Sequence, residues 1–172
     1  MQNAISLNSR FWMMAGFLPF IICLYVALSP AMAQDGNSRP DFETDKFHIE
    51  TTDGRIYQFH LEVADTSQKR TYGLMFVEEM AADEGMIFIW DKPALRHFWM
   101  RNTFVSLDIL FFDKAGRLIH IAEHTTPLSD RSIPSVGPTQ FVVELNAGEA
   151  HRRQLDIGSQ LHFSGNHKKT EN

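Results

Sequence analysis

Residues 97–112 read HFWMRNTFVSLDILFF, and this stretch decides much of the fold. The segment His97–Met100 predicts a short strand. Leu107–Phe112 predicts a longer one, because a nearly continuous apolar run of this length is typical of a buried strand. The turn-forming residues Asp113–Gly116 end it. The stretch therefore contributes two strands to a domain rich in β-structure.

Outward from this stretch, alternating or short apolar runs predict six more strands, at residues 47–51, 56–64, 86–90, 117–122, 140–145 and 160–163. Asp53-Gly54 predicts a hairpin turn between the first two of them. A second turn is expected at Asp83–Gly85, and a surface loop at Thr125–Thr139, which contains three prolines.

Two short helices are expected, at residues 66–72 and 147–155. Asp65 and Gln68 have the spacing of a capping box at the start of the first, and Gly73 is expected to end it in a left-handed turn. About eight short strands with two short helices predict a mainly β (α+β) domain, folded as a compact barrel or sandwich. A doubly wound sheet would need longer helices between its strands.

The composition is that of a globular protein. The chain has 172 residues, 44% of them hydrophobic and 22% charged, with a formal net charge of −5. This argues against a disordered chain. The acidic balance also argues against nucleic acid as a partner, because nucleic-acid binding needs a basic face.

The N-terminal segment 1–33 has the three parts of a secretory signal peptide. Arg10 is its only charged residue, an uncharged run follows at residues 11–28, and Ala31-Met32-Ala33 supplies a cleavage site before Gln34. The alternative is an uncleaved anchor, since the run is just long enough to span a membrane. The sequence thus predicts export to the periplasm or the exterior, with membrane contact only through this segment if it stays attached.

The expected mature chain consists of a polar linker at residues 34–46, one domain at residues 47–164 and a polar tail at residues 165–172. The only cysteine, Cys23, lies in the signal segment. The domain therefore enters an oxidising compartment without disulfides, a thiol nucleophile or thiolate metal ligands. Packing alone has to stabilise it.

The sequence resembles the DUF192 family. The resemblance rests on residues 98–112, on Ala64–Phe76 and Asp83–Phe88, and on the later segments Pro127–Ser129 and Glu144–Gly148, and it covers about residues 47–164 in order. It implies a small, mostly β domain that is often exported and has no assigned biochemical role.

This chain departs from the usual pattern of the family at three positions. Val77 and Arg101 stand where Arg and Lys are frequent, and Ser106 stands where Pro is frequent. The first departure argues against any site that needs a base directly after Met75-Phe76. The second keeps the positive charge, and the third suggests a turn before Leu107 that is stiffened differently.

Arg70 and Asp108 are the first two candidate site residues. Asp108 interrupts an apolar strand, so we expect its carboxylate to be paired, with Arg70 or Arg101 as partner. A buried ion pair is one interpretation, and a carboxylate with a perturbed pKa in a cleft is the other. Arg70 either stabilises a helix C-terminus or binds an anion.

A pocket floor and rim are suggested by Trp99, Met100, Asn102 and Thr103, which combine an aromatic ring, a soft apolar group and short polar side chains. The same mixture would also suit a strand that leaves the core through a turn.

These residues favour a non-enzymatic binding module of the cell envelope. Its partner would be a small molecule, an extended peptide or an envelope protein, and no cofactor is expected. One alternative is a hydrolase or lyase that acts on an envelope polymer through Asp108 or Glu123. A second is a copper or zinc protein that uses histidines such as His120 and His124 together with methionines, although no histidine pair has the spacing of a known metal motif.

Overall fold

The computed structural model describes residues 38–163. The expected signal peptide at residues 1–33 and the expected tail at residues 165–172 lie outside the described residues. The expected linker is described from residue 38 on, and its last three residues, Thr44–Lys46, already belong to the first strand.

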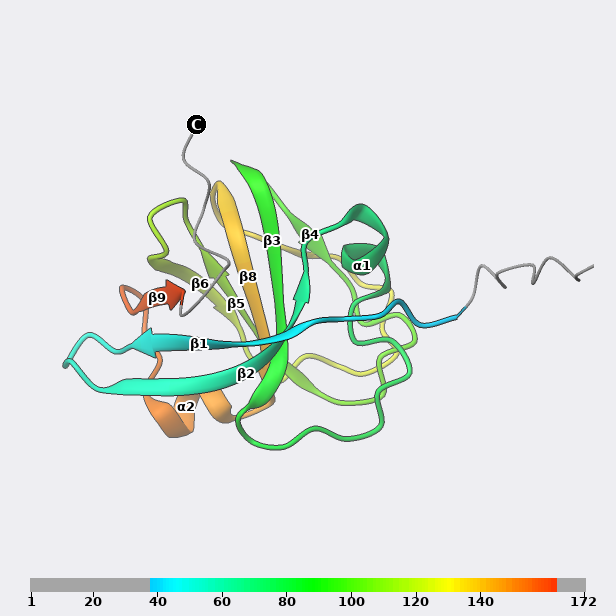
Figure 1. The fold of residues 1–172 in the computed structure, drawn as a ribbon, viewed down its shortest axis with the longest axis horizontal. Coiled ribbons are helices and arrows are strands. Elements are labelled where there is room, and N and C mark those ends of the chain that lie inside the picture. Colours follow the sequence, from blue (N-terminus) through cyan, green and yellow to red (C-terminus); the bar gives the residue numbers. More distant parts are fainter. Residues whose placement is uncertain (1–37, 164–172) are drawn as a thin grey trace, which may run out of the picture. The chain divides into compact units, whose positions relative to one another are not determined.

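The described residues form nine strands and two helices, which Figure 1 shows in their spatial arrangement. Seven strands build one sheet in the order β6-β5-β8-β3-β2-β1-β9, and β4 pairs with β7 in a small second sheet. The bounds are β1 Thr44–Glu50, β2 Ile56–Ala64, α1 Ser67–Tyr72, β3 Glu84–Ala94, β4 His97–Phe98, β5 Leu107–Phe112, β6 Leu118–Ala122, β7 Ile133–Pro134, β8 Thr139–Asn146, α2 Glu149–Arg153 and β9 Gln160–Phe163.

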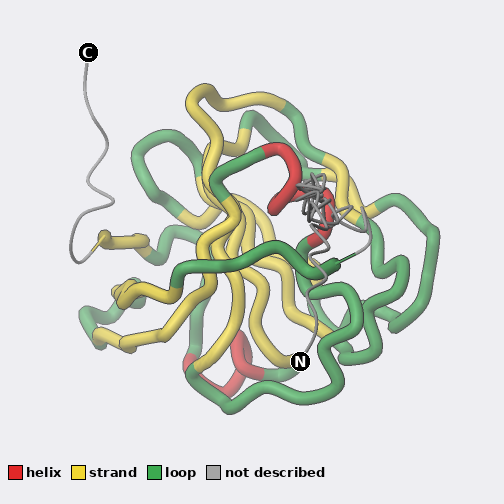
Figure 2. The backbone as a smooth tube through the Cα atoms, turned by 45° about the vertical axis from the view of Figure 1, so that its right-hand side comes forward, coloured by secondary structure: helices red, strands yellow, loops and turns green. Residues whose placement is uncertain are grey.

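The mainly β fold predicted from the sequence is confirmed. The large sheet curls into a half-barrel, visible as the bent strands in Figure 2. Its two edge strands approach each other at one end, where the N–H of Leu118 donates to the backbone oxygen of Ser159 and that of Leu161 to Gly116, both at 2.8 Å. The prediction of a continuous loop at Thr125–Thr139 is wrong in one place, since Ile133–Pro134 forms β7 against β4. No helix within residues 38–163 is long and apolar enough to cross a membrane.

The turns predicted at three glycines do not all form. Gly54 has a φ of 85° in the β1–β2 hairpin, and Gly73 ends α1 with a φ of 54°, as the sequence predicts. Gly85, in contrast, lies inside β3 rather than in a turn. A Cβ atom at this position would lie 2.1 Å from the backbone oxygen of Glu144, so glycine is needed for the close approach of β3 and β8.

Helix α1 begins one residue later than its capping-box spacing suggests. The cap is Thr66, whose side chain accepts a hydrogen bond from the N–H of Lys69, and not Asp65. Helix α1 buries no side chain completely, so its attachment depends on individual polar contacts.

Both faces of the central strands are buried. One face, together with β1, β2, β6, β9 and α2, forms a core that we call the seven-strand core. The other face forms the loop-covered core, which is closed by the segments around Leu74 and Met100 and by the small β4–β7 sheet, whose Phe98 and Ile133 pack against it. Neighbouring residues on β8 alternate between them, with Val143 in the seven-strand core and Val142 in the loop-covered core. The candidate site lies on the loop-covered side.

Candidate functional site

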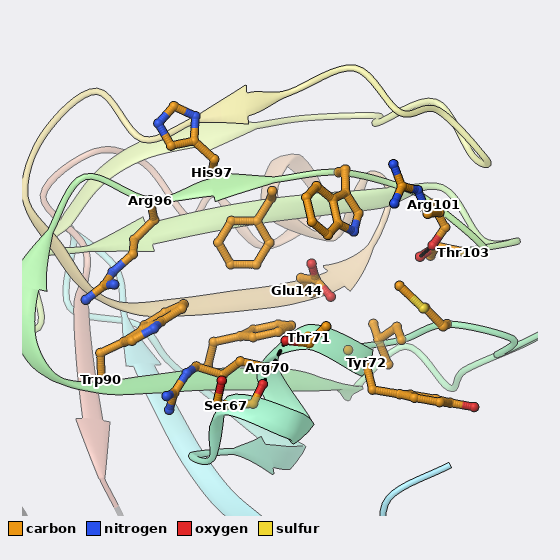
Figure 3. A pocket seen from close by; sticks show the side chains of 16 residues that line it. Ser67, Arg70, Thr71, Tyr72, Trp90, Arg96, His97, Arg101, Thr103 and Glu144 are labelled. Carbon is orange, nitrogen blue, oxygen red and sulfur yellow. Dashed lines mark hydrogen bonds between the residues drawn. The ribbon is translucent and has the colours of Figure 1, made fainter. Parts of the chain in front are cut away.

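A cavity of about 310 Å³ lies between α1 with the turn that follows it, the end of β3, and the segment Arg96–Thr103. Figure 3 shows Trp90 and Arg96 at one end of this cavity, Tyr72, Arg101 and Thr103 at the other, and Glu144 of β8 between the two ends. The lining is aromatic and polar. It contains Ser67, Arg70, Thr71, Tyr72, Gly73, Leu74, Met75, Phe88, Trp90, Arg96, His97, Phe98, Trp99, Arg101, Thr103 and Glu144.

Two arginines and a tryptophan form the first end of the cavity. The guanidinium carbon of Arg96 lies 4.3 Å from the centre of the Trp90 ring, and that of Arg70 lies 5.4 Å from it. Trp90 itself belongs to an aromatic cluster with Phe88 and Phe98, which fixes the position of its ring. The two cations are therefore anchored on one rigid aromatic side chain.

Backbone oxygens hold both arginines in place. Nη1 of Arg70 donates to the backbone oxygens of Asp65 and, at 2.8 Å, Ile89, which ties α1 to β3. Nη2 of Arg96 donates to the backbone oxygen of Lys92 at 2.7 Å. These bonds use only part of each guanidinium, because arginine has five N–H donors.

Neither arginine has an acidic partner among residues 38–163. Nη2 of Arg70 and Nη1 of Arg96 also have no hydrogen-bond acceptor there. Burial, and then the positive charge of Arg70, lower the pKa of Arg96, so the two guanidiniums are close enough to repel each other. An anion placed between them would relieve this repulsion and use the free N–H groups.

Glu144 provides the carboxyl group of the cavity. The residue is 5% exposed, and its side chain makes no hydrogen bond or ion pair with residues 38–163. Because burial disfavours the charged form, the pKa of Glu144 rises to about 8. At neutral pH this carboxyl is mainly protonated, so it offers a hydrogen-bond donor and does not repel an anion.

The second end of the cavity is more open. Trp99 is 45% exposed, with the guanidinium of Arg101 5.0 Å from its ring centre. The charge of Arg101 is balanced by Asp130, whose Oδ1 lies 2.6 Å from Nε. The unbalanced positive charge of the cavity is thus concentrated at the Arg70–Arg96 end.

The structure brings together three of the six site residues predicted from the sequence, because Arg70, Trp99 and Thr103 all line the cavity. Met100 does not, since it is 1% exposed within the loop-covered core. Asn102 lies in the loop behind the rim, where its backbone oxygen accepts a hydrogen bond from the N–H of Phe76 at 2.8 Å.

The expected pairing of Asp108 with Arg70 or Arg101 is wrong. Asp108 is fully buried, and its carboxylate accepts hydrogen bonds from the backbone N–H groups of His124, Gly148 and Ala150 at 2.8–3.0 Å. Two of these donors belong to the first turn of α2, whose N-cap Gly148 has no side chain to satisfy them. Asp108 therefore caps α2 from the neighbouring strand and takes no part in the cavity.

The expected metal-binding pattern does not form in the described part of the chain. Strand β6 ends at Ala122, and His124 adopts a positive φ of 51°, so His120 and His124 do not share a strand face. His120 stacks on Phe111, and burial lowers its pKa. Within residues 38–163, no group of three or more His, Cys, Asp or Glu side chains could hold a metal ion.

Three residues of the cavity were not among the six site residues predicted from the sequence. Like Asp108, Glu144 is an acid within an apolar strand, and this pattern could have identified it as a candidate. Trp90 ends a strongly apolar run, which gives no hint of a ligand. Arg96 had no signal, because only the tertiary structure places it beside Arg70.

Comparison with known proteins places this geometry in a family. The model of DUF192, described as an uncharacterized ACR, matches residues 48–163. A crystal structure of a "putative transcription regulator" from Sinorhizobium meliloti 1021 is 32% identical, with a TM-score of 0.70, and the match covers 73% of this chain and 97% of that one. A protein of unknown function from Novosphingobium aromaticivorans DSM 12444 is 33% identical, with a TM-score of 0.68, over 74% of this chain and 95% of that one. No curated protein matches the chain.

Proposed function

The chain belongs to the DUF192 family, and from the cavity that this fold builds we propose that it is a non-enzymatic module that binds a small anionic organic ligand. One observation carries the proposal. Arg70 and Arg96 both lie against the ring of one tryptophan in a cavity, without an acidic partner among residues 38–163. Unpaired, part-buried guanidiniums at the end of a cavity are suited to a carboxylate or a phosphate.

The rest of the cavity supports the same ligand class. The rings of Trp90, Phe98 and Trp99 supply apolar contact for the body of the ligand. Glu144, protonated below its raised pKa of about 8, offers a hydrogen bond to a hydroxyl or carbonyl oxygen of the ligand. The ligand is thus expected to have an acidic group at one end and a polar atom near its middle.

The export expected from the sequence remains part of the proposal. We infer that the module works in the periplasm or outside the cell, where its partner is a ligand of the envelope. The support is the pattern of residues 1–33.

The binding test compares anions with neutral molecules of the same shape. Two of the protein's three tryptophans, Trp90 and Trp99, line the cavity, so intrinsic fluorescence reports on its occupation. Benzoate, butanoate and butyl phosphate are the anionic probes, with benzamide and butanol as neutral analogues. We expect at least one anion to bind and its neutral analogue not to bind, and we expect affinity to fall as salt is added.

The double variant Arg70→Gln/Arg96→Gln tests the placement. It should weaken anion binding by about tenfold or more, because a charge-assisted hydrogen bond contributes about 1.5–3 kcal/mol. Arg117→Gln is the matched control, since Arg117 is an exposed arginine that does not line the cavity. Equal affinity of the double variant and the wild type, with both folded by circular dichroism, would refute the anion site.

An acid–base enzyme is the second candidate function, and Glu144 is the observation that favours it. The carboxylates expected to serve it do not line this cavity, since Asp108 caps α2 and Glu123 lines a different hollow. A protonated carboxyl in a cavity is suited to general-acid catalysis. Hydrolysis of a glycosidic bond normally needs two carboxyl groups, and among residues 38–163 only Glu144 brings a carboxyl to this cavity. The enzyme would be established instead if the wild type converts a bound anion to product and the Glu144→Gln variant still binds that anion but no longer converts it.

A further inference from the structure

The open end of the cavity continues into a row of exposed rings. Tyr72 lines the cavity and lies 6.1 Å, centre to centre, from the ring of Phe76, which in turn lies 6.0 Å from the ring of Phe104. We call these three side chains the aromatic row. Phe76 and Phe104 are 46% and 44% exposed. An apolar path therefore leads from the cavity to the surface.

This exposure is concentrated in one region. Eight large hydrophobic side chains are exposed within residues 38–163, and four of them, Phe76, Trp99, Phe104 and Leu128, lie on three loops that meet at this end of the cavity. Scattered single apolar residues on a surface need no explanation, but a contiguous group indicates a binding surface.

Hydrogen bonds between the loops hold the apolar side chains in place. The N–H of Phe76 donates to the backbone oxygen of Asn102, and that of Leu128 donates to Thr103 at 3.1 Å. Phe76, Asn102 and Leu128 all have a positive φ, between 56° and 64°. Bulky side chains rarely adopt this backbone conformation, and where it persists it is often part of a functional arrangement.

The two ends of this path differ in chemistry. The inner end has the unpaired guanidiniums of Arg70 and Arg96, whereas Phe76, Phe104 and Leu128 at the outer end carry no side-chain hydrogen-bonding group. Such side chains favour an apolar group, because contact with the rings removes apolar surface of both partners from water.

We propose that the ligand is an anionic amphiphile, with its acidic head between Arg70 and Arg96 and a hydrocarbon tail that passes Glu144 and lies along the aromatic row. This inference rests on the proposed function, because it assigns the tail of a ligand whose head the cavity binds. Beyond the polar atom that meets Glu144, a straight alkyl chain fits this assignment, since the aromatic row offers apolar contact and ends at the solvent.

The test is a series of alkanoates of increasing length, from butanoate through hexanoate and octanoate to decanoate, each used below its micelle concentration. Affinity is measured by titration calorimetry and by the fluorescence of Trp90 and Trp99. Burial of one CH₂ group strengthens binding by up to about fourfold. We expect an increase of about two- to fourfold for each added CH₂ once the chain passes the rim.

The double variant Phe76→Asn/Phe104→Ser should lose this increase and keep the wild-type affinity for butanoate. Asparagine tolerates the positive φ at position 76, so the variant is expected to fold. Ile56→Ser/Ile157→Ser is the matched control. It removes two side chains that are 62% and 58% exposed elsewhere on the surface, and it should leave the length dependence unchanged.

The possible failures are distinguishable. If butanoate binds and affinity does not rise with chain length, the amphiphile is refuted and the anion site stands. An increase that persists in the double variant would place the tail elsewhere. If none of butanoate, butyl phosphate and benzoate binds, the proposed function itself fails. A last outcome concerns membranes. If the wild type sediments with phosphatidylglycerol vesicles, the double variant does not, and no free alkanoate shows a length dependence, the aromatic row binds a lipid bilayer instead.

Discussion

Asp108 and Glu144 show how two residues with the same sequence pattern acquire different roles. Each is an acid within an apolar strand, and in the register of β5 with β8 Glu144 lies opposite Ile109 and Asp108 opposite Leu145. Because adjacent residues of a strand point to opposite faces, the two carboxyls lie on different sides of the sheet. Asp108 meets three backbone N–H groups, whereas Glu144 lines a cavity that supplies it no partner.

Glu144 should make the stability of the protein depend on pH. Its pKa rises from an ordinary value of 4.5 to about 8 in the folded state. Between these values the folded protein holds a proton that the unfolded chain has released, so the free energy of unfolding is highest below this window and falls as pH rises through it. The expected slope is up to about 1.4 kcal/mol per pH unit.

Glu144→Gln should flatten this slope and stabilise the protein at alkaline pH, as measured by urea unfolding from pH 5 to 9. The other ionisable side chains of the cavity are Arg70, Tyr72, Arg96, His97 and Arg101, and the variant leaves them in place. Glu123→Gln is the control, because Glu123 is exposed. A wild-type curve that is no steeper than that of Glu144→Gln would show that Glu144 is ionised in the folded state.

At the scale of elements, the close approach of β3 and β8 and the hydrogen bonds of α1 position the site. Strand β3 can lie against β8 only because residue 85 is glycine, and the Glu144 peptide lies directly at this contact. Helix α1 buries no complete side chain, and Arg70 connects it to β3 through the backbone oxygen of Ile89. The guanidinium of Arg70 thus holds α1 in place as a wall of the cavity, and it still has N–H groups that can bind a ligand.

Gly85→Ala should destabilise the fold by about 3 kcal/mol or more, because the added Cβ would lie 2.1 Å from the backbone oxygen of Glu144, with side chains of Leu61 and Leu145 within 3.2 Å. Gly137→Ala is the control. Its Cβ would meet only the side chain of Ile119, at 3.6 Å. Thermal and urea unfolding measure both. Equal stability of the two variants would contradict the role of Gly85 in strand packing.

At the scale of the whole molecule, the half-barrel separates stability from binding. The seven-strand core takes side chains from all strands of the large sheet and from α2. The loop-covered face is closed by loops, and there the packing leaves a cavity of about 310 Å³. Loops on a rigid scaffold can change their side chains at a low cost to the fold, which suits the proposed binding role of this face.

The proposed export also concerns the whole chain. If residues 1–33 act as a cleaved signal peptide, the exported protein should begin at Gln34, which intact-mass spectrometry of the periplasmic or secreted fraction determines. Leucine at positions 31 and 33 should block cleavage, because the peptidase needs small residues there. A chain that keeps Met1 and stays in the cytoplasm would contradict the export proposal.

The sequence by itself determined eight of the nine strands, the turn residues at positions 54 and 73, and the mainly β fold class. These features follow from local alternation and backbone preference, so they can be predicted without knowledge of distant residues. It also predicted Arg70, Trp99 and Thr103 as candidate site residues, and the structure places all three in the lining of one cavity.

Only the tertiary structure decided which charges meet. Sequence spacing cannot show that Asp108 faces the start of α2, that Arg96 stands beside Arg70, or that Glu144 lies between the two ends of a cavity. These juxtapositions depend on strand order and register, in which one residue of shift moves a side chain to the opposite face of the sheet. The chemistry of the site therefore depends on long-range strand pairing, although some of its residues can be recognised from the sequence alone.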